Sequence, residues 1–103
     1  MIGNTRLFDA VNALASGPRD ARNRVVIAMQ ILSVLQERDF QSTPELWGRI
    51  CKLRKATQTC PPLIHAGEGH ILRDSYTTTA QNRHNRTYAK YAAEIFEIWR
   101  ATC

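Results

Sequence analysis

The chain has 103 residues, of which 44% are hydrophobic and 22% are charged. This length suits one domain with a single core, and this composition excludes an intrinsically disordered chain. The 14 Lys and Arg outnumber the 9 Asp and Glu, so the formal net charge is +5 and the chain suits an anionic partner, either nucleic acid or an acidic protein surface.

No segment has the length of a transmembrane helix or the order of a signal peptide. The longest uncharged apolar run, Val25 to Met29, is far below the ~20 residues that a membrane span needs. The three cysteines, Cys51, Cys60 and Cys103, are an odd number and too few for a secreted disulfide framework. We therefore expect a cytoplasmic protein with free thiols and no membrane partner.

The first two predicted helices cover about residues 5–15 and 18–36, with a tight corner at Gly17 and Pro18 between them. The apolar residues of the first recur at helical spacing: Leu7, Phe8, Val11, Leu14 and Ala15. In the second, nine of the twelve residues from Arg24 to Leu35 are apolar. This pattern predicts a helix that is surrounded by protein, with Gln30 and Ser33 as its narrow polar strip.

Helices are also predicted at about 44–56 and 85–102. Pro44 and Glu45 favour a helix start, and the last helix carries an apolar stripe of Tyr88, Tyr91, Ala92, Ile95, Phe96 and Trp99. Between them, residues 57–69 contain two prolines and two glycines and are predicted to form a long loop that wraps one end of the bundle. Residues 70–79 are predicted as a helix rather than a strand, because no second strand is evident to pair with them.

The predicted fold is all-α: a single domain, residues 1–103, in which four to five helices pack around the central apolar helix at 18–36. Part of it, from Gly17 to Ile50, resembles a family of small uncharacterised bacterial helical proteins. The residues that carry the resemblance are the run from Gly17 to Val25, then Ala28, Leu32, Leu35, Asp39, Phe40, Glu45 and Leu46. Gln41 departs from the pattern, which has a proline there. The resemblance implies a bacterial, mobile-element or phage-related origin, and it implies no activity.

Basic residues form the main candidate binding site. Arg49, Lys52, Arg54 and Lys55 lie toward the end of the helix at 44–56, and Arg73, Arg83, Arg86 and Lys90 lie around the start of the last helix. If these two ends adjoin, they make one positive patch for phosphates. No helix-turn-helix spacing, zinc finger or RNA-binding aromatic signature accompanies the charge. Complementing a helix dipole is an alternative role that explains the first group but not the second.

Cys60, His65 and His70 are remote candidates for a metal site, because zinc accepts cysteine and histidine ligands. Their spacing lacks the close ligand pairs of small zinc domains, and free thiols and loop histidines explain them as well. A thiol nucleophile paired with a histidine would also need an orienting partner and an oxyanion hole, which the sequence does not define. We therefore predict no catalytic residue and no cofactor, and keep a thiol or zinc-dependent enzyme as a remote alternative.

The sequence thus leads to a small non-enzymatic interaction protein: a regulator, inhibitor or accessory subunit that docks on another macromolecule. A basic face and a surplus of apolar helix surface support this prediction, and a protein partner or a homo-oligomer is expected. Nucleic-acid binding through the basic patch is the alternative.

Overall fold

A computed structural model describes residues 2–16, 20–64, 67, 69 and 71–102. This part of the chain contains five α-helices, one 3₁₀-helix and two short strands. In chain order they are α1 (Ile2–Ser16), α2 (Ala21–Leu32), η1 (Glu37–Phe40), α3 (Pro44–Thr57), β1 (Leu63–Ile64), β2 (Ile71–Arg73), α4 (Ser75–Gln81) and α5 (Asn85–Ala101). The all-α prediction is confirmed, as are the helices predicted at 5–15, 44–56 and 85–102, and a small β-hairpin is added.

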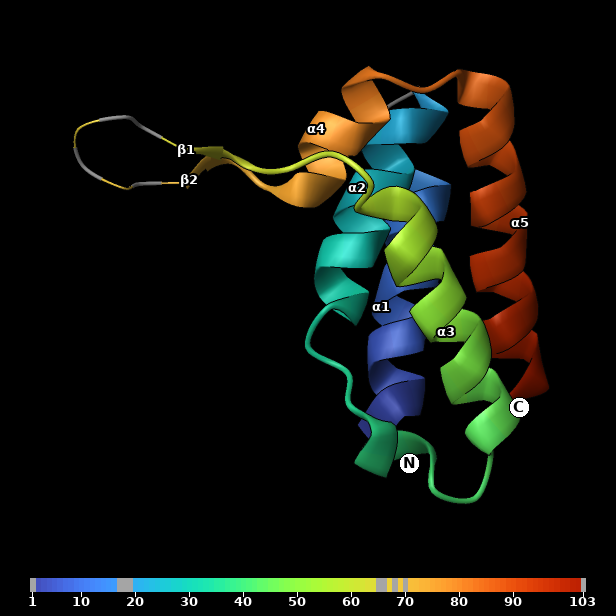
Figure 1. The fold of residues 1–103 in the computed structure, drawn as a ribbon. Helices are drawn as coiled ribbons and strands as arrows, with labels where there is room; N and C mark the ends of the chain where they lie inside the picture. Colours follow the sequence, from blue (N-terminus) through green and yellow to red (C-terminus); the bar gives the residue numbers. More distant parts are fainter. Residues whose placement is uncertain (1, 17–19, 65–66, 68, 70, 103) are drawn as a thin grey trace.

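The long helices α1, α2, α3 and α5 lie side by side and alternate in direction along the chain (Figure 1). The start of α2, the end of α3, α4 and the start of α5 form one end of the bundle, which we call the hairpin end because β1 and β2 project from it. The opposite end, the η1 end, holds η1, the starts of α1 and α3 and the end of α5. Helix α2 contacts α1, α5, α4 and α3.

One continuous core joins all five α-helices and η1. Its largest fully buried side chains include Tyr88 of α5 and Phe40 of η1, and Phe40 stacks on Trp47 of α3 with ring centroids 5.9 Å apart. The other apolar core residues are Leu7, Ala10, Val25, Val26, Ala28, Met29, Leu32, Leu35, Leu46, Ile50, Leu53, Tyr76, Ala80, Ile95 and Ile98. Every helix therefore contributes to the same core.

Helix α2 is shorter than the predicted 18–36. It begins after Asp20, whose carboxylate accepts a hydrogen bond from the backbone N–H of Arg22 at 2.8 Å. It ends at Leu32, and Arg54 of α3 donates to the carbonyl oxygens of Leu32 (2.6 Å) and Leu35 (2.7 Å). These bonds satisfy carbonyls that a continued helix would have used itself. Pro18, the predicted first residue, lies outside the described residues.

The sequence predicted that this apolar helix is surrounded by protein, but the structure leaves one side of it exposed. Val25, Ala28, Met29 and other residues of α2 are buried, but Ile27 is exposed, and so is Val34 just beyond the helix. The solvent-exposed strip is thus wider than Gln30 and Ser33 alone.

The prediction for residues 57–79 is wrong in two respects. Thr57 is the last residue of α3, and the predicted loop contains β1, which pairs antiparallel with β2 inside the predicted helix at 70–79. The prediction assumed that no second strand is present, but Leu63 pairs with Arg73 and Ile64 pairs with Ile71. Helix α4 begins only after the strand, and the hairpin projects away from the bundle instead of wrapping it (Figure 1).

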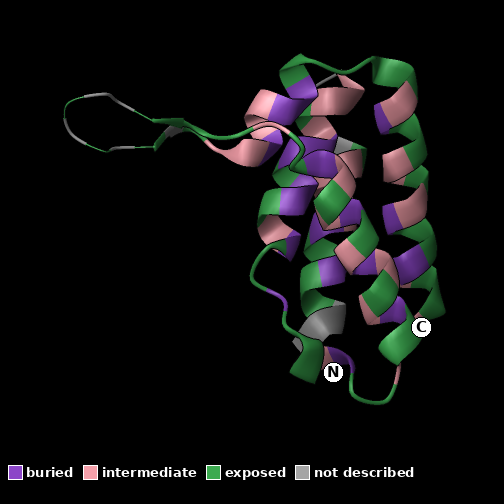
Figure 2. Ribbon diagram, in the orientation of Figure 1, coloured by how far each residue is buried: buried purple, intermediate pink, exposed green. Residues whose placement is uncertain are grey.

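Two predicted apolar stripes are wider than the faces that the structure buries. Phe8 and Ala15 of α1 and Phe96 of α5 belong to the stripes but are exposed. Ile98 does not belong to the predicted stripe of α5, but it is buried. Figure 2 shows exposed residues along the outer side of α5.

Candidate docking surface

The β-hairpin places large aliphatic side chains in solvent. Leu63, Ile64 and Ile71 are 47%, 51% and 66% exposed. Strands of two and three residues form only a narrow sheet, and no helix of the described chain covers it (Figure 1). An isolated two-stranded hairpin is marginally stable in water, so covering these side chains would stabilise the hairpin.

Hydroxyl groups of α4 fix the base of the hairpin to the bundle. The carbonyl oxygen of Cys60 accepts a hydrogen bond from Ser75 at 2.8 Å, and the backbone N–H of Cys60 donates to the hydroxyl of Thr79 at 3.0 Å. Thr78 donates to the carbonyl of Pro61 at 2.9 Å. The chain that leaves α3 is therefore held against α4 before it enters β1.

Asp74 connects the other leg of the hairpin to α2. It caps α4 by accepting from the backbone N–H of Thr77 at 2.8 Å, and it accepts from the side-chain amide of Gln30 at 2.8 Å. Burial raises the pKa of Asp74, but the hydrogen bonds from Thr77 and Gln30 outweigh it, so the pKa lies below its ordinary value. The carboxylate is thus held in its charged form at the junction of α2, α4 and the hairpin.

Two residues of the predicted basic patch are bound within the bundle. Arg49 donates to the carboxylate of Glu94 on α5 at 2.6 Å, and this hydrogen bond raises the pKa of Arg49. The guanidinium of Arg54 bonds the carbonyls at the end of α2 and lies 5.0 Å from the ring centroid of Trp47. We therefore assign Arg49 and Arg54 to helix packing.

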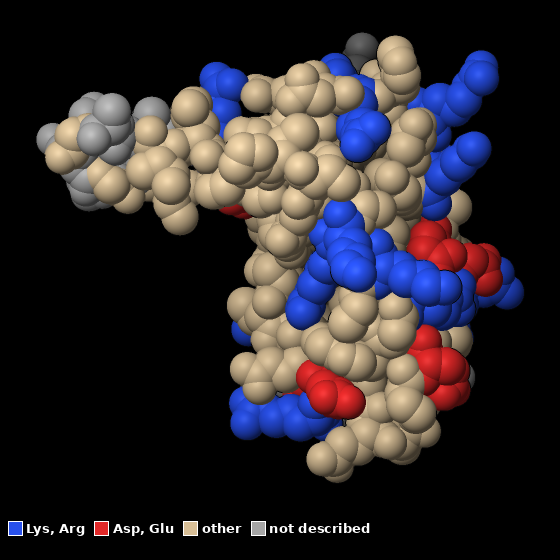
Figure 3. All heavy atoms as spheres, in the orientation of Figure 1, with Lys and Arg blue, Asp and Glu red and all other residues tan. Residues whose placement is uncertain are grey.

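The other predicted basic residues lie at or near the hairpin end. Arg83 donates to the hydroxyl of Thr59 at 3.2 Å, which brings the chain after α3 beside the chain before α5, as the patch requires. Of the predicted patch residues, the exposed cations with no ion pair to any described residue are Lys52, Lys55, Arg73, Arg83, Arg86 and Lys90. Figure 3 shows Lys and Arg gathered over α3 and the start of α5, with the acidic residues of this face mostly nearer the η1 end.

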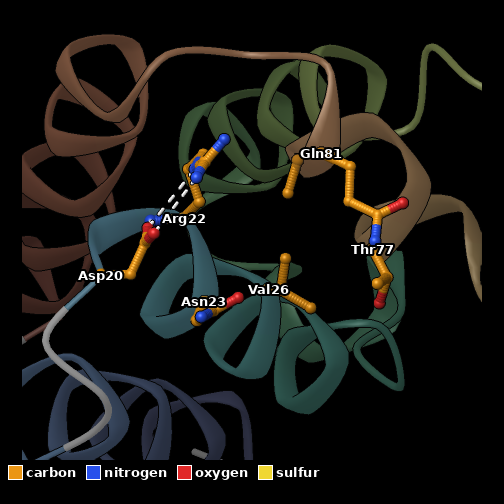
Figure 4. A pocket seen from close by; sticks show the side chains of 7 residues that line it. Asp20, Arg22, Asn23, Val26, Thr77 and Gln81 are labelled. Carbon is orange, nitrogen blue, oxygen red and sulfur yellow. Dashed lines mark hydrogen bonds and ion pairs between the residues drawn. The ribbon is translucent and has the colours of Figure 1, made fainter.

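A small polar cavity lies between the start of α2 and α4 (Figure 4). It has a volume of about 250 Å³ and is lined by Asp20, Arg22, Asn23, Val26, Thr77, Ala80 and Gln81. Arg22 forms an ion pair with Asp20 at 3.2 Å, and the side-chain hydrogen bond from Arg22 lowers the pKa of Asp20. Thr77 donates its hydroxyl to Asp74. The carboxylates in and beside this cavity, Asp20 and Asp74, cap α2 and α4.

The structure tests the predicted thiol site only in part. Cys60 is half-buried and its sulfur accepts a long hydrogen bond from the amide of Asn82, at 3.7 Å. His65 and His70 lie outside the described residues. Within the described ranges, no group of three or more His, Cys, Asp or Glu is placed to hold a metal ion. Cys51 is a free, half-buried thiol on α3.

The sequence contained a signal for the hairpin that the prediction did not use. Leu63 and Ile64 are separated from Ile71 and Leu72 by a short segment with two glycines, and two aliphatic runs around such a segment indicate a hairpin. A run of only two residues on each side is too short to reveal the alternating pattern of a strand.

Among the described helices, none combines the length and hydropathy that crossing a bilayer requires. Comparison with protein-family models, with curated proteins and with solved structures finds no match to this chain. A function has to be argued from the surfaces of the molecule itself.

Proposed function

We propose that this chain is a small non-enzymatic interaction protein that docks on an acidic protein through its hairpin end. It would act as a regulator, inhibitor or accessory subunit of that protein. The observation that carries the proposal is the hairpin itself, which holds Leu63, Ile64 and Ile71 in solvent on an element that projects from the bundle. Exposed apolar groups surrounded by polar residues are typical of protein interaction sites.

The charge around the hairpin defines the chemistry of the partner. Arg73 lies on β2, and Lys55, Arg83 and Arg86 lie at the same end of the bundle. The described acidic residues at this end, Asp20 and Asp74, are engaged as helix caps. A partner with an apolar groove bordered by carboxylates would complement this surface, whereas a second copy of the same end would be repelled.

We also propose that α2 organises the bundle. Its buried face, which includes Val25, Met29 and Leu32, supports this role together with its contacts to every other long helix. The hairpin end is then positioned by α2 through Gln30 and Asp74.

Site-specific photo-crosslinking tests the docking proposal. A photoreactive amino acid is placed at Ile71 or, as a control of similar exposure far from the hairpin, at Val34, which is 56% exposed. In cells that contain the natural partner, position 71 should give a discrete protein adduct that position 34 does not give, and the adduct should contain an acidic protein. The purified pair should bind at least about tenfold more weakly with Ile71→Asp. Equal adducts at both positions, or unchanged affinity for this variant, would contradict the proposal.

Nucleic-acid binding is the second candidate, and the exposed Lys52, Lys55, Arg86 and Lys90 favour it because they lack an acidic partner among the described residues. A fluorescently labelled DNA duplex provides the probe. Phosphate contacts predict an affinity that falls steeply with salt and is reduced by Lys52→Glu and Lys55→Glu but not by Ile71→Asp. Docking through the hairpin instead predicts that Ile71→Asp weakens the binding of its protein partner.

A further inference from the structure

The side of the bundle formed by α1 and α5 exposes a second apolar surface. Phe8 is 50% exposed and Phe96 is 42% exposed. Trp99 lies between them, with ring centroids 6.2 Å from Phe8 and 5.8 Å from Phe96. The three rings therefore form one aromatic cluster that bridges the two helices, at the half of the bundle nearer the η1 end.

Helical spacing extends this surface toward the hairpin end. Ala89 and Ala93 are exposed, and they precede Phe96 by seven and three residues, which places them on the same side of α5. Ala15 is exposed seven residues after Phe8, on the same side of α1. We define the α1/α5 face by its apolar residues: Phe8, Val11, Ala15, Ala89, Ala92, Ala93, Phe96 and Trp99.

The side chains of the α1/α5 face decrease in size from one end of the face to the other. Because α1 and α5 are antiparallel, the large rings of Phe8, Phe96 and Trp99 lie together at one end of the face and the methyl groups of Ala15 and Ala89 at the other. On this side of α5, the residues between Arg86 and Arg100 are uncharged. A surface with protruding rings at one end and small side chains at the other is complementary to itself after a half-turn.

We propose that the α1/α5 face binds a second copy of this chain, with the helices of the two copies antiparallel across a two-fold axis near Ala92 and Ala93. Each aromatic cluster then packs on the alanine half of the other copy. The α1 and α5 helices have 15 and 17 residues, so the face is roughly 22 Å long and accommodates both halves.

Charge supports the same arrangement. Along the outer surface of α5, Arg86 and Lys90 lie in the first half. The second half holds Glu94, which pairs with Arg49, and Glu97, which pairs with Arg100 at 3.2 Å. An antiparallel pairing of two α5 helices brings Arg86 of one copy toward Glu97 of the other, and it places the two basic hairpin ends far apart. A parallel pairing would bring the two hairpin ends together, where their positive charges would repel.

The first test measures the solution mass of the full chain over a range of concentrations. The expected mass is twice the 11.7 kDa of one chain. Phe96→Glu and Ala93→Lys should each weaken dimerisation about a hundredfold or more, because every substitution acts twice in a symmetric interface. Both positions are exposed, so the helical circular dichroism should be retained. Val34→Glu and Ile71→Asp, at exposed aliphatic residues outside the face, should leave the mass of the dimer unchanged.

Charge reversal tests the antiparallel arrangement. Arg86→Glu and Glu97→Arg should each weaken the dimer roughly tenfold, and the double variant should recover most of that loss. A double variant that is as weak as either single variant would overturn the antiparallel arrangement. A mass of one chain at every concentration, or a dimer that Ile71→Asp dissociates and Phe96→Glu does not, would overturn the proposed face. Because Ile71→Asp reports on hairpin docking alone, the two proposals fail separately.

Discussion

The hairpin and the α1/α5 face both expose apolar side chains, but they do so on different supports. The hairpin carries Leu63, Ile64 and Ile71 on strands of two and three residues that cover no core. The α1/α5 face carries Phe8 and Phe96 on two long helices whose inner sides hold Leu7, Ile95 and Ile98 of the core. One surface is thin and projecting, and the other is broad and supported from below.

Their charged surroundings differ as well. The hairpin end is basic, whereas α5 carries the cations Arg86 and Lys90 in its first half and a mixture of Glu94, Glu97 and Arg100 in its second. Exposure of apolar groups alone therefore does not identify a partner. The distribution of charge around the groups separates a surface suited to an acidic partner from one suited to its own copy.

The largest effect on stability is expected at Arg54, which joins α3 to the end of α2 and lies outside the α1/α5 face. Arg54→Ala removes the two bonds to the end of α2 and the contact with Trp47, so the free energy of unfolding should fall by about 2–3 kcal/mol. Lys55→Ala, at the exposed neighbouring residue, should change it by less than about 0.5 kcal/mol. Urea denaturation measures both variants. Equal effects would show that Arg54 is a surface charge like Lys55.

Asp74 should have the next largest effect, because it joins α4 to α2. Asp74→Ala removes the helix cap and the bond from Gln30, and should lower the free energy of unfolding by about 1–2 kcal/mol. Asp9→Ala on α1 is a matched control at an exposed carboxylate, with an expected change below about 0.5 kcal/mol. Hydrogen exchange should show that Asp74→Ala loosens α4 and β2 more than α1 and α5. Uniform loosening of all helices would contradict this local role.

The same carboxylate makes the stability depend on pH. The pKa of Asp74 is lower in the folded chain than its ordinary value near ~3.9, so in acid the unfolded chain binds this proton first. The contribution of Asp74 is therefore present above about pH 4 and is lost as the pH falls through the lower pKa of the folded state. Asp74→Asn should show a shallower fall in unfolding free energy below pH 4 than the natural chain. If the unfolding free energies of Asp74→Asn and the natural chain fall equally steeply below pH 4, Asp74 does not cause this pH dependence.

A smaller effect of opposite sign is expected at Tyr88 in the core. Its hydroxyl is buried with no hydrogen-bond partner among the described residues, and burial together with the charge of Tyr91 raises the pKa of Tyr88 to about 12. Tyr88→Phe removes a polar group that lost its contacts with water on folding, so it should raise the free energy of unfolding by about 0.5–1 kcal/mol. Tyr76→Phe is the control, because Tyr76 is also buried but bonds Gln58, and it should lower the stability instead. Thermal denaturation distinguishes the two signs.

The smallest effect is expected on the hairpin. Ile71→Ser removes a side chain that already lies mostly in solvent, so the free energy of unfolding should change by less than about 0.5 kcal/mol. Phe96→Ser should also change little at concentrations where the chain is a monomer, and should lower the melting temperature where it is a dimer. A concentration-dependent effect of Ile71→Ser would assign self-association to the hairpin and break the distinction between the two surfaces.

Local signals predicted most of the helices, and contacts between distant residues explain where the prediction failed. Helix α3 begins at Pro44 as expected, because proline and the following glutamate act within one turn. Helix α2 ends earlier than predicted, and Arg54, 22 residues beyond Leu32, donates to the carbonyl at that end. The strand at Ile71–Arg73 forms because a two-residue partner exists earlier in the chain, and such a short partner has no pattern of its own.

The sequence indicates which basic residues group together, but it does not show which of them are already paired within the chain. The sequence places basic residues around the end of α3 and the start of α5, and the bond between Arg83 and Thr59 brings these two segments together. Sequence alone could not show that Arg49 is paired with Glu94, 45 residues away. Nor could it show which side of each apolar stripe faces solvent, since Phe8 and Phe96 fit the helical period as well as the buried residues do.

The attachment of the hairpin has a mechanical consequence. One leg is held at Cys60 by the hydroxyls of Ser75 and Thr79, and the other leg runs through Asp74 directly into α4. Both legs are thus fastened to the same seven-residue helix. The two legs of the hairpin are therefore positioned together by α4, and the bond between Asp74 and Gln30 couples α4 to α2.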